Sequence, residues 1–266
     1  MTFVFFSIRY EEKGGSMITK KIFVSLIIVF NLCFSAFSNA MDVNPSESNY
    51  WDDILKSYRC DEKINELVFV KYKGQTHADI VMYVKQNEDW KKLFSCKGFI
   101  GKDGIGSGSR YSSATPIGIY NIIFAFGIKG DLQTGLNHFQ VKNSHYCCAC
   151  RKYNNKFIDS DAGAILCFDK DTGNIQWKKD SSLISHDCSN DVNDGGEHLI
   201  QYSPQYDYAF MFDYNSEGEY GRGSAFFFHV NGDYEFTGGC IAVSEENMKF
   251  ILKNLHFGSK VCIGYA

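Results

Sequence analysis

Short apolar runs separated by polar or glycine-containing turns dominate the chain, and long stretches with helical spacing are rare. Leu67–Tyr72 and Asp79–Val84 are rich in β-forming residues and flank a turn at Lys73-Gly74, which predicts a hairpin. A third strand is expected at Trp90–Ile100, and a strongly apolar, central strand at Ile119–Phe126. The pattern therefore predicts a mainly β fold.

The C-terminal half continues this pattern and adds one clear helix. Strands are expected at Tyr208–Tyr214, Ser224–Val230 and Lys260–Gly264. Ser244–Leu255 predicts a helix, because a serine can cap its N-terminus, two glutamates suit its positive end, and its apolar residues recur at helical spacing. A second, shorter helix is expected at Tyr50–Tyr58, where tryptophan, isoleucine and leucine side chains would pack.

The first 40 residues are expected to lie outside the folded protein. After Met17, two lysines lead into the apolar run Ile22–Phe34, and small residues follow at Ser38–Ala40, a pattern typical of a secretory signal peptide. The apolar run is shorter than the roughly 20 residues that span a bilayer, so we expect no stable membrane insertion after cleavage; an uncleaved anchor is the alternative. This divides the chain into an upstream extension (1–16), a signal peptide (17–40), an N-terminal segment (41–60) and a main domain (61–266).

Composition excludes one class of partner. The chain has 27 lysines and arginines against 31 aspartates and glutamates, a formal net charge of −4, and no block of basic residues. Binding to nucleic acid draws its affinity from the neutralisation of phosphates, so a mildly acidic chain is a poor candidate for it. We expect no nucleic-acid partner; the oligomeric state is open.

Cysteines are numerous, and nine of them follow the signal segment. In a secreted chain the odd number suggests one free thiol, while the other eight form up to four disulfides or remain buried thiols. Some of them cluster with histidines in and after the irregular region Asp131–Asp161. A zinc site is the alternative for this cluster, but it lacks paired Cys-x-x-Cys spacing, and we expect neither metal nor cofactor. The cluster consists of His145, Cys147, Cys148, Cys150, Cys167, His186 and Cys188.

The most distinctive chemistry lies near the C-terminus. His229 ends an apolar run, and Cys240 follows in a glycine-flanked turn before another apolar run. A cysteine becomes a nucleophile when an adjacent imidazole acts as its base or lowers its thiol pKa from about 8.5. Gly238 and Gly239 would let backbone N–H groups near the sulfur bind the oxyanion of a tetrahedral intermediate.

Other readings of these residues remain open. Cys240 could be a buried or disulfide-bonded cysteine, and His229 a strand-end histidine whose hydrogen bonds are satisfied. If the pair is catalytic, Thr237 or Asn231 could orient the imidazole.

Several blocks along the chain together carry a resemblance to a known family. The blocks are Thr115–Tyr120, Ala125–Gly127, Glu197–Leu199, Phe212–Asn215, Gly223–His229 and Thr237–Val243. In this order they resemble the L,D-transpeptidase catalytic domain (YkuD-type) of bacterial cell-wall enzymes, in a branch with a Thr-x-Gly-Cys motif. The commonest form of the family has Ser-His-Gly before the cysteine and Arg or Asn two residues after it, where this chain has Thr237-Gly238-Gly239 and Ala242.

The resemblance implies a β-sandwich with one helix after the catalytic cysteine, and it makes 61–266 the catalytic domain. It implies an enzyme of the cell envelope that acts on peptidoglycan stem peptides. Cys240 would attack a carbonyl of a tetrapeptide stem and release the terminal D-alanine, with His229 as base and then acid. A side-chain amine of a neighbouring stem would resolve the thioester into a 3→3 crosslink.

Two alternatives to this function stay open. If water resolves the thioester, the protein is an L,D-carboxypeptidase that trims tetrapeptide stems. If the thiol is silent, it is a non-catalytic cell-wall-binding domain stabilised by zinc or disulfides. Within the block Glu197–Leu199, His198 is expected to pack and form hydrogen bonds rather than to catalyse.

Overall fold

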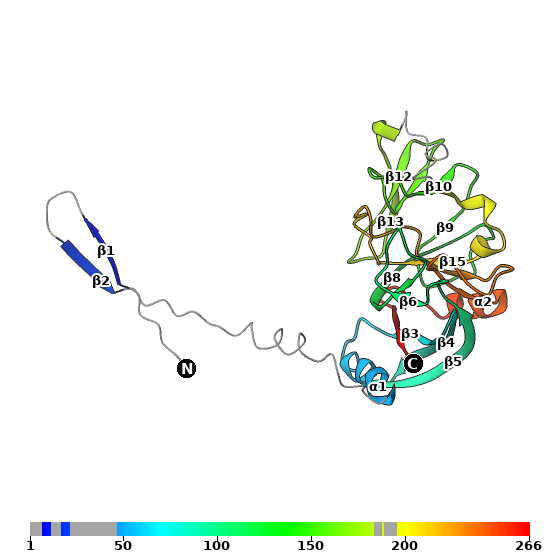
Figure 1. Ribbon diagram of the computed structural model, residues 1–266, viewed down its shortest axis with the longest axis horizontal. Coiled ribbons are helices and arrows are strands. Elements are labelled where there is room, and N and C mark those ends of the chain that lie inside the picture. The colour runs from blue at the N-terminus through cyan, green and yellow to red at the C-terminus, as the bar shows by residue number, and fades with distance from the viewer. Residues whose placement is uncertain (1–6, 12–16, 22–46, 184–187, 189–195) are drawn as a thin grey trace. The chain divides into compact units, whose positions relative to one another are not determined.

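The computed structural model describes residues 7–11, 17–21, 47–183, 188 and 196–266. The chain forms two compact units, Met1–Pro45 and Ser46–Ala266. In the first, β1 (Ser7–Glu11) pairs antiparallel with β2 (Met17–Lys21). Apart from β2, the predicted signal segment 17–40 lies outside the described residues. The second unit contains the candidate site (Figure 1).

Three long antiparallel strands follow the first helix of the second unit, as predicted: β3 (Glu66–Gly74), β4 (His77–Gln86) and β5 (Asp89–Phe99). Alternate residues of β3 point to opposite faces of the sheet, and both faces are buried. Val68 and Val70 face one hydrophobic core, whereas Leu67 and Phe69 face another. A strand that is covered on both sides reads as a continuous apolar run, which is what the sequence shows.

Eight strands of the described residues close into a barrel. Their order around the ring is β15 (Ala209–Phe212), β16 (Phe227–Val230), β17 (Ile241–Val243), β5, β4, β3, β18 (Lys260–Tyr265) and β8 (Gly118–Gly127). The ring closes because β15 pairs with both β16 and β8. The expectation of a mainly β fold is confirmed. This sheet differs from the open layer of a sandwich, because β15 is hydrogen-bonded to a neighbouring strand on each side and so closes the sheet on itself. A further strand, β9 (His138–Gln140), pairs with β8 outside the ring.

A second antiparallel sheet of five strands lies beside the barrel (Figure 1). Aromatic side chains from both sheets, among them Phe126, Phe157 and Phe227, form one hydrophobic core. The region Asp131–Asp161, expected to be the least regular, contains three strands of only three or four residues, which are too short to show a clear alternation in the sequence. In spatial order the strands are β13 (Ile175–Lys179), β12 (Ala164–Phe168), β11 (Lys156–Asp159), β10 (His145–Cys148) and β14 (Glu197–His198).

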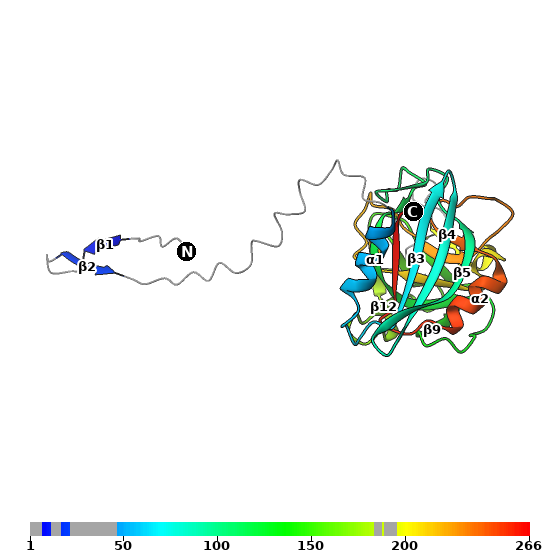
Figure 2. The same ribbon diagram turned by 90° about the horizontal axis from the view of Figure 1, so that it is seen from below.

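The strands β3, β4 and β5 run between two α-helices (Figure 2). The buried residues Met248, Ile251 and Leu252 of the second helix belong to the same core as Val68 and Val70, whereas the first helix packs against Leu67 and Phe69 on the opposite face of β3. In α2 (Glu245–Lys253), Ser244 caps the N-terminus by accepting the Asn247 N–H at 3.3 Å, as predicted. Neither helix has the length and apolar character that a bilayer crossing requires, within the described part of the chain. Short elements complete the unit: a parallel pair β6 (Ile105–Gly106) and β7 (Thr115–Pro116), and 3₁₀ turns at Ser181–Leu183, Leu199–Gln201 and Gln205–Asp207.

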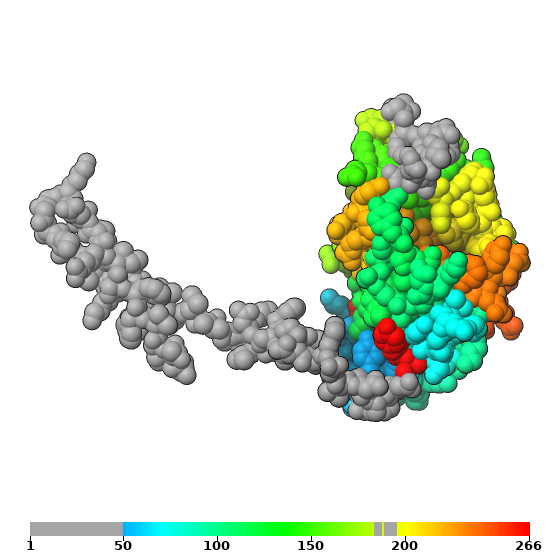
Figure 3. All heavy atoms as spheres, viewed as in Figure 1, coloured from blue at the N-terminus to red at the C-terminus, as the bar shows by residue number. Residues whose placement is uncertain are grey.

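Helix α1 (Glu47–Ser57) confirms the short helix predicted near Tyr50, and it packs within the second unit. Trp51 is buried against Phe69, with ring centroids 4.8 Å apart, and its indole N–H donates to the Tyr265 carbonyl at 2.9 Å. The red end of β18, where Tyr265 is exposed, is visible at the surface (Figure 3). This helix therefore covers the outer face of β3 and β18.

Trp51→Ala should lower the free energy of unfolding by about 3–5 kcal/mol, because it leaves a cavity between α1 and the barrel. Urea denaturation followed by fluorescence or circular dichroism measures this. Tyr111→Ala is the control, since Tyr111 is 85% exposed, and it should change the free energy by no more than about 0.5 kcal/mol. Equal effects of the two substitutions would contradict this packing of α1.

Candidate active site

Parallel pairing of β16 with β17 brings the predicted thiol and imidazole to one face of the barrel wall. The register places Phe228 beside Ile241 and His229 beside Ala242. Because alternate residues of a strand share a face, His229 lies on the same face as Phe227. Cys240 immediately precedes β17, two residues before Ala242, and lies in the same core as Phe227, whose N–H donates to its sulfur.

Both side chains line a cavity of about 230 Å³. Its wall also includes Thr237 and Gly238 from the turn before the cysteine, and Glu197 from β14. Both residues are otherwise buried, since His229 is 6% and Cys240 8% exposed. The arrangement gives a small substrate group access to a thiol and a ring nitrogen at the same place.

The Cys240 sulfur is held by two backbone groups. Its S–H donates to the Ala225 carbonyl at 3.0 Å, and the Phe227 N–H donates to the sulfur at 3.3 Å. Burial raises the pKa of the thiol well above its usual range, and the charge of Glu197 raises it further, whereas the bond from Phe227 lowers it. The thiol is therefore protonated at neutral pH in this conformation.

The imidazole of His229 is neutral and oriented. Burial lowers the pKa of His229 to about 4, while the bond to the Val230 carbonyl acts in the opposite direction. That bond joins Nδ1 to the Val230 oxygen at 2.7 Å; since a carbonyl only accepts, Nδ1 carries the hydrogen and Nε2 has the lone pair of a base. The lowering of the Cys240 pKa expected from this imidazole is absent here, because a neutral ring offers the thiolate no positive charge.

The turn before Cys240 is fixed by threonine hydroxyls. Thr237 donates to the Cys240 carbonyl at 2.7 Å and accepts the Gly239 N–H at 3.1 Å, and Thr115 donates to the same carbonyl at 3.2 Å. Gly239 has a φ of +128°, and a Cβ there would lie 2.5 Å from the Phe226 ring, so this position requires glycine. The Gly239 N–H is thus already bonded, whereas Gly238 faces the cavity.

The two residues considered as orienting groups are bonded elsewhere. Thr237 acts on the cysteine turn, and the Asn231 side chain donates to the Gly232 carbonyl at 3.5 Å. The backbone N–H of Asn231 donates to Val243 at 2.7 Å and so extends the pairing of β16 with β17. In the described residues, the hydrogen bond that orients the imidazole is the one to Val230.

An asparagine that sequence reasoning missed supports the thiol. Ala225, which accepts the Cys240 S–H, has a φ of +57°, a conformation that costs a non-glycine residue about 1–2 kcal/mol. Its N–H donates to Asn155 Oδ1 at 2.9 Å, and Asn155 Nδ2 donates to the carbonyls of Asn215 and Tyr214 at 2.9 and 3.3 Å. Asn155 therefore holds the strained backbone that positions the sulfur.

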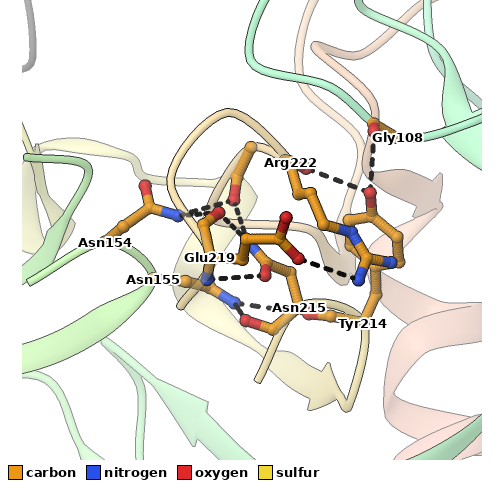
Figure 4. Close-up of polar contacts among 8 residues, drawn as sticks. Gly108, Asn154, Asn155, Tyr214, Asn215, Glu219 and Arg222 are labelled. Atoms are coloured by element: carbon orange, nitrogen blue, oxygen red, sulfur yellow. Dashed lines mark hydrogen bonds and ion pairs between the residues drawn. The ribbon is translucent and has the colours of Figure 1, made fainter. Parts of the chain in front are cut away.

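Two further asparagines hold the loop before Ala225 (Figure 4). Asn154 donates to the carbonyls of Glu219 and Gly223, both at 3.1 Å, and Asn215 donates to the same two carbonyls at 3.0 and 2.6 Å. Asn155 and Asn215 have φ values of +58° and +50°. Asparagine tolerates this conformation better than most residues, so these asparagines were the sequence signal for the loop.

Glu197 also belongs to the site, although nothing in the sequence indicated that it lies near Cys240. It lines the cavity, and its Oε2 accepts from the Tyr206 hydroxyl at 2.5 Å. Burial raises the pKa of its carboxyl to about 7, although the bond from Tyr206 lowers it. The next residue, His198, stacks on Tyr146 with centroids 4.5 Å apart and bonds to the Asn143 carbonyl, the packing role expected for it.

The cysteine and histidine cluster shows no metal site in the part of the chain that the structure describes. No group of three or more histidine, cysteine, aspartate or glutamate side chains there is arranged to hold an ion. Nor does any disulfide join the nine cysteines in the described ranges. His186, one of the ligands considered for zinc, lies outside the described residues.

No family model matches this sequence, and neither does any curated protein. Among solved structures, the helical cell shape determining protein Pgp2 from Campylobacter jejuni is 14% identical with a TM-score of 0.36, over 80% of this chain and 55% of that one. Bdellovibrio bacteriovorus Bd1075 is 14% identical with a TM-score of 0.37, over 76% and 48%. A fused Zn-dependent amidase/peptidase/peptidoglycan-binding domain-containing protein from Clostridium acetobutylicum is 10% identical with a TM-score of 0.31, over 84% and 65%.

The chain thus spans about half to two thirds of the length of these three proteins. With TM-scores below 0.5, the three likenesses carry no argument about fold or function.

Asn155→Ala should lower the free energy of unfolding by about 1–3 kcal/mol, because it removes the partner of the Ala225 N–H and of the Tyr214 carbonyl, while the Asn215 carbonyl keeps only its bond from the Gly218 N–H. It should also change the reactivity of Cys240, whose sulfur is bonded to Ala225. Urea denaturation and the rate of alkylation of Cys240 by iodoacetamide, mapped by mass spectrometry, measure the two effects. Asn143→Ala, at an exposed position, is the control. If it matches Asn155→Ala in both assays, the hydrogen bonds of Asn155 have no role in holding Ala225 or the thiol.

Proposed function

We propose that this protein is a secreted cysteine L,D-transpeptidase that acts on peptidoglycan stem peptides. The observation that carries the proposal is the parallel pairing of β16 with β17, which brings a buried thiol and an imidazole with an unprotonated Nε2 to one cavity. The resemblance of the surrounding blocks supplies the reaction. In this proposal residues 17–40 direct the chain to the cell envelope, and 61–266 form the catalytic domain.

The first half of the reaction forms a thioester. The Cys240 proton passes to His229 Nε2 as the sulfur attacks a carbonyl of a tetrapeptide stem. The C–N bond then breaks, and His229 returns the proton to the amine of the departing D-alanine. Because the thiol donates to Ala225 before substrate binds, this transfer requires the substrate to displace that bond; catalytic hydrogen bonds commonly tighten only in the bound complex.

Backbone near Gly238 stabilises the oxyanion in this proposal. Gly238 lines the cavity, and nothing lies within 4 Å of the position a Cβ would occupy there, so a substrate carbonyl can approach the main chain. One such donor contributes roughly 3 kcal/mol to transition-state stabilisation. The Gly239 N–H takes part only if its bond to Thr237 is released.

The group that accepts the acyl chain from the thioester determines which of two activities the enzyme has. An amine of a neighbouring stem resolves the thioester into a 3→3 crosslink, whereas water would give trimmed tripeptide stems. The first outcome is transpeptidation and the second is L,D-carboxypeptidase activity.

Incubation of the protein with tetrapeptide-stem muropeptides should yield crosslinked dimers and free D-alanine, and Cys240→Ala should abolish both. Liquid chromatography with mass spectrometry identifies the products. Cys96→Ala is the matched control, since Cys96 is a half-buried cysteine of the barrel wall outside the cavity, and it should retain activity. Trimmed tripeptides without dimers would indicate a carboxypeptidase, and product formation by Cys240→Ala would refute the nucleophile.

The rate of acylation by a carbapenem should persist as the pH falls through 6.5, and decline only as it approaches about 4. The reason is that burial lowers the pKa of His229 to about 4, so its imidazole stays able to accept a proton over that interval. Stopped-flow absorbance between pH 4 and 8 measures the rate.

Circular dichroism at each pH is the control for this measurement. The unfolded chain protonates His229 near pH 6.5 but the folded chain only near pH 4, so this residue makes stability fall as the pH decreases between those values. A rate that declines near pH 6.5 while the protein stays folded would contradict the role of His229 as a buried, neutral base.

A further inference from the structure

One carboxyl group in the cavity has no part in the steps described above. Glu197 lies in β14, beside Cys147 in the register with β10, and it lines the same cavity as His229 and Cys240. A glutamate in this position is neither a surface charge nor a core residue. Because Glu197 lines the cavity, its carboxyl is placed to contact a substrate group bound there.

One oxygen of the Glu197 carboxyl is bound by a buried tyrosine. The Tyr206 hydroxyl donates to it at 2.5 Å, and Tyr206 is 3% exposed. The Tyr206 ring packs edge-on against Phe227 and His229, with centroids 5.5 and 5.6 Å apart. One aromatic side chain thereby connects the carboxyl with the candidate base and with the strand that binds the sulfur.

The carboxylate has no cationic partner in the part of the chain that the structure describes. The ion pairs there join other carboxylates, and the hydrogen bond to Glu197 comes from a neutral phenol. Its charge raises the pKa of the Cys240 thiol, which opposes formation of the thiolate. The carboxylate is therefore a disadvantage for thioester formation. Its negative charge instead favours binding of a positively charged group in the cavity.

The second half of the reaction supplies such a group. A primary alkyl amine has a pKa near 10.4, so it enters the site as an ammonium ion and must lose a proton before it can attack. A carboxylate binds the ammonium ion by a charge-assisted hydrogen bond. Because burial raises the pKa of Glu197 to about 7, the group can also accept a proton near neutral pH and later release it.

We propose that Glu197, held by Tyr206, binds the primary amine that resolves the thioester and accepts the first proton from it. This role rests on the proposed function of the Cys240 site. It specifies the acceptor as a peptide with a primary alkyl amine, and it makes Glu197 a catalytic residue of the second half-reaction alone.

The step balances as follows. The ammonium group gives one proton to the Glu197 carboxylate, and the nitrogen lone pair forms a bond to the thioester carbon. The nitrogen gives a second proton to His229 Nε2, and the C–S bond breaks with its electron pair on sulfur. His229 then protonates the Cys240 thiolate, and Glu197 releases its proton to solvent. The products are an amide, the thiol and one proton.

Glu197→Gln separates the two half-reactions, because glutamine keeps the volume and an acceptor for Tyr206 but loses the charge. Acylation by a carbapenem should not slow, because loss of the charge removes an obstacle to the thiolate, whereas the ratio of crosslinked to hydrolysed muropeptide should fall at least tenfold. Glu235→Gln is the matched control, because it removes one negative charge from an exposed position and should leave the ratio unchanged. Glu197→Asp, which keeps the charge, should restore part of the crosslinking.

Hydroxylamine distinguishes proton transfer from a merely structural role. This weakly basic amine is already neutral at pH 7, so it needs neither an ion pair nor a proton acceptor before it attacks. Glu197→Gln should transfer the acyl group to hydroxylamine at the wild-type rate while failing with alkyl amines.

Three results would overturn the inference. Equal crosslinking by wild type and Glu197→Gln would remove the role of the carboxylate. Equal loss of hydroxylamine and alkyl-amine transfer would show that Glu197 only maintains the site. Absence of an acyl-enzyme in the wild type would refute the proposed function itself, a signal that is distinct from any change in the product ratio.

Discussion

The candidate site depends on the parallel pairing of two short strands. Because His229 lies beside Ala242 in that register, the imidazole and the sulfur of Cys240 share one face of the barrel wall. The surrounding structure maintains this pairing. Strand β15 closes the barrel on the other side of β16, Thr115 and Thr237 fix the turn that ends at the cysteine, and Asn155 holds the strained backbone at Ala225.

Burial sets the chemistry of the site. It keeps both the thiol and the imidazole uncharged, so the pair differs from a preformed thiolate–imidazolium pair and its nucleophile forms only as the proton moves. The carboxyl of Glu197 adds a negative charge that disfavours the thiolate. A cationic acceptor would neutralise that charge, which is the physical link between the proposed function and the further role of Glu197.

Sequence patterns predicted local features well and long-range ones poorly. The hairpin at β3 and β4 and the capped helix α2 follow from residues close together in the chain. Closure of the barrel depends on Ala209–Phe212 pairing on both sides with strands distant in sequence, which no local pattern specifies. His229 and Cys240 stood out by residue type and spacing. Glu197 did not, because the sequence does not show that Tyr206 holds it in the same cavity.

The central claim is that Cys240, of the nine cysteines from Cys60 onward, is the nucleophile that carries the acyl group. Rapid acid quench during turnover of a tetrapeptide muropeptide, followed by peptide mapping with mass spectrometry, tests it directly. The account predicts a thioester on the peptide that contains Cys240, with the mass of the donor stem less one D-alanine. An acyl group on any other cysteine, or D-alanine release without a thioester on Cys240, would contradict it.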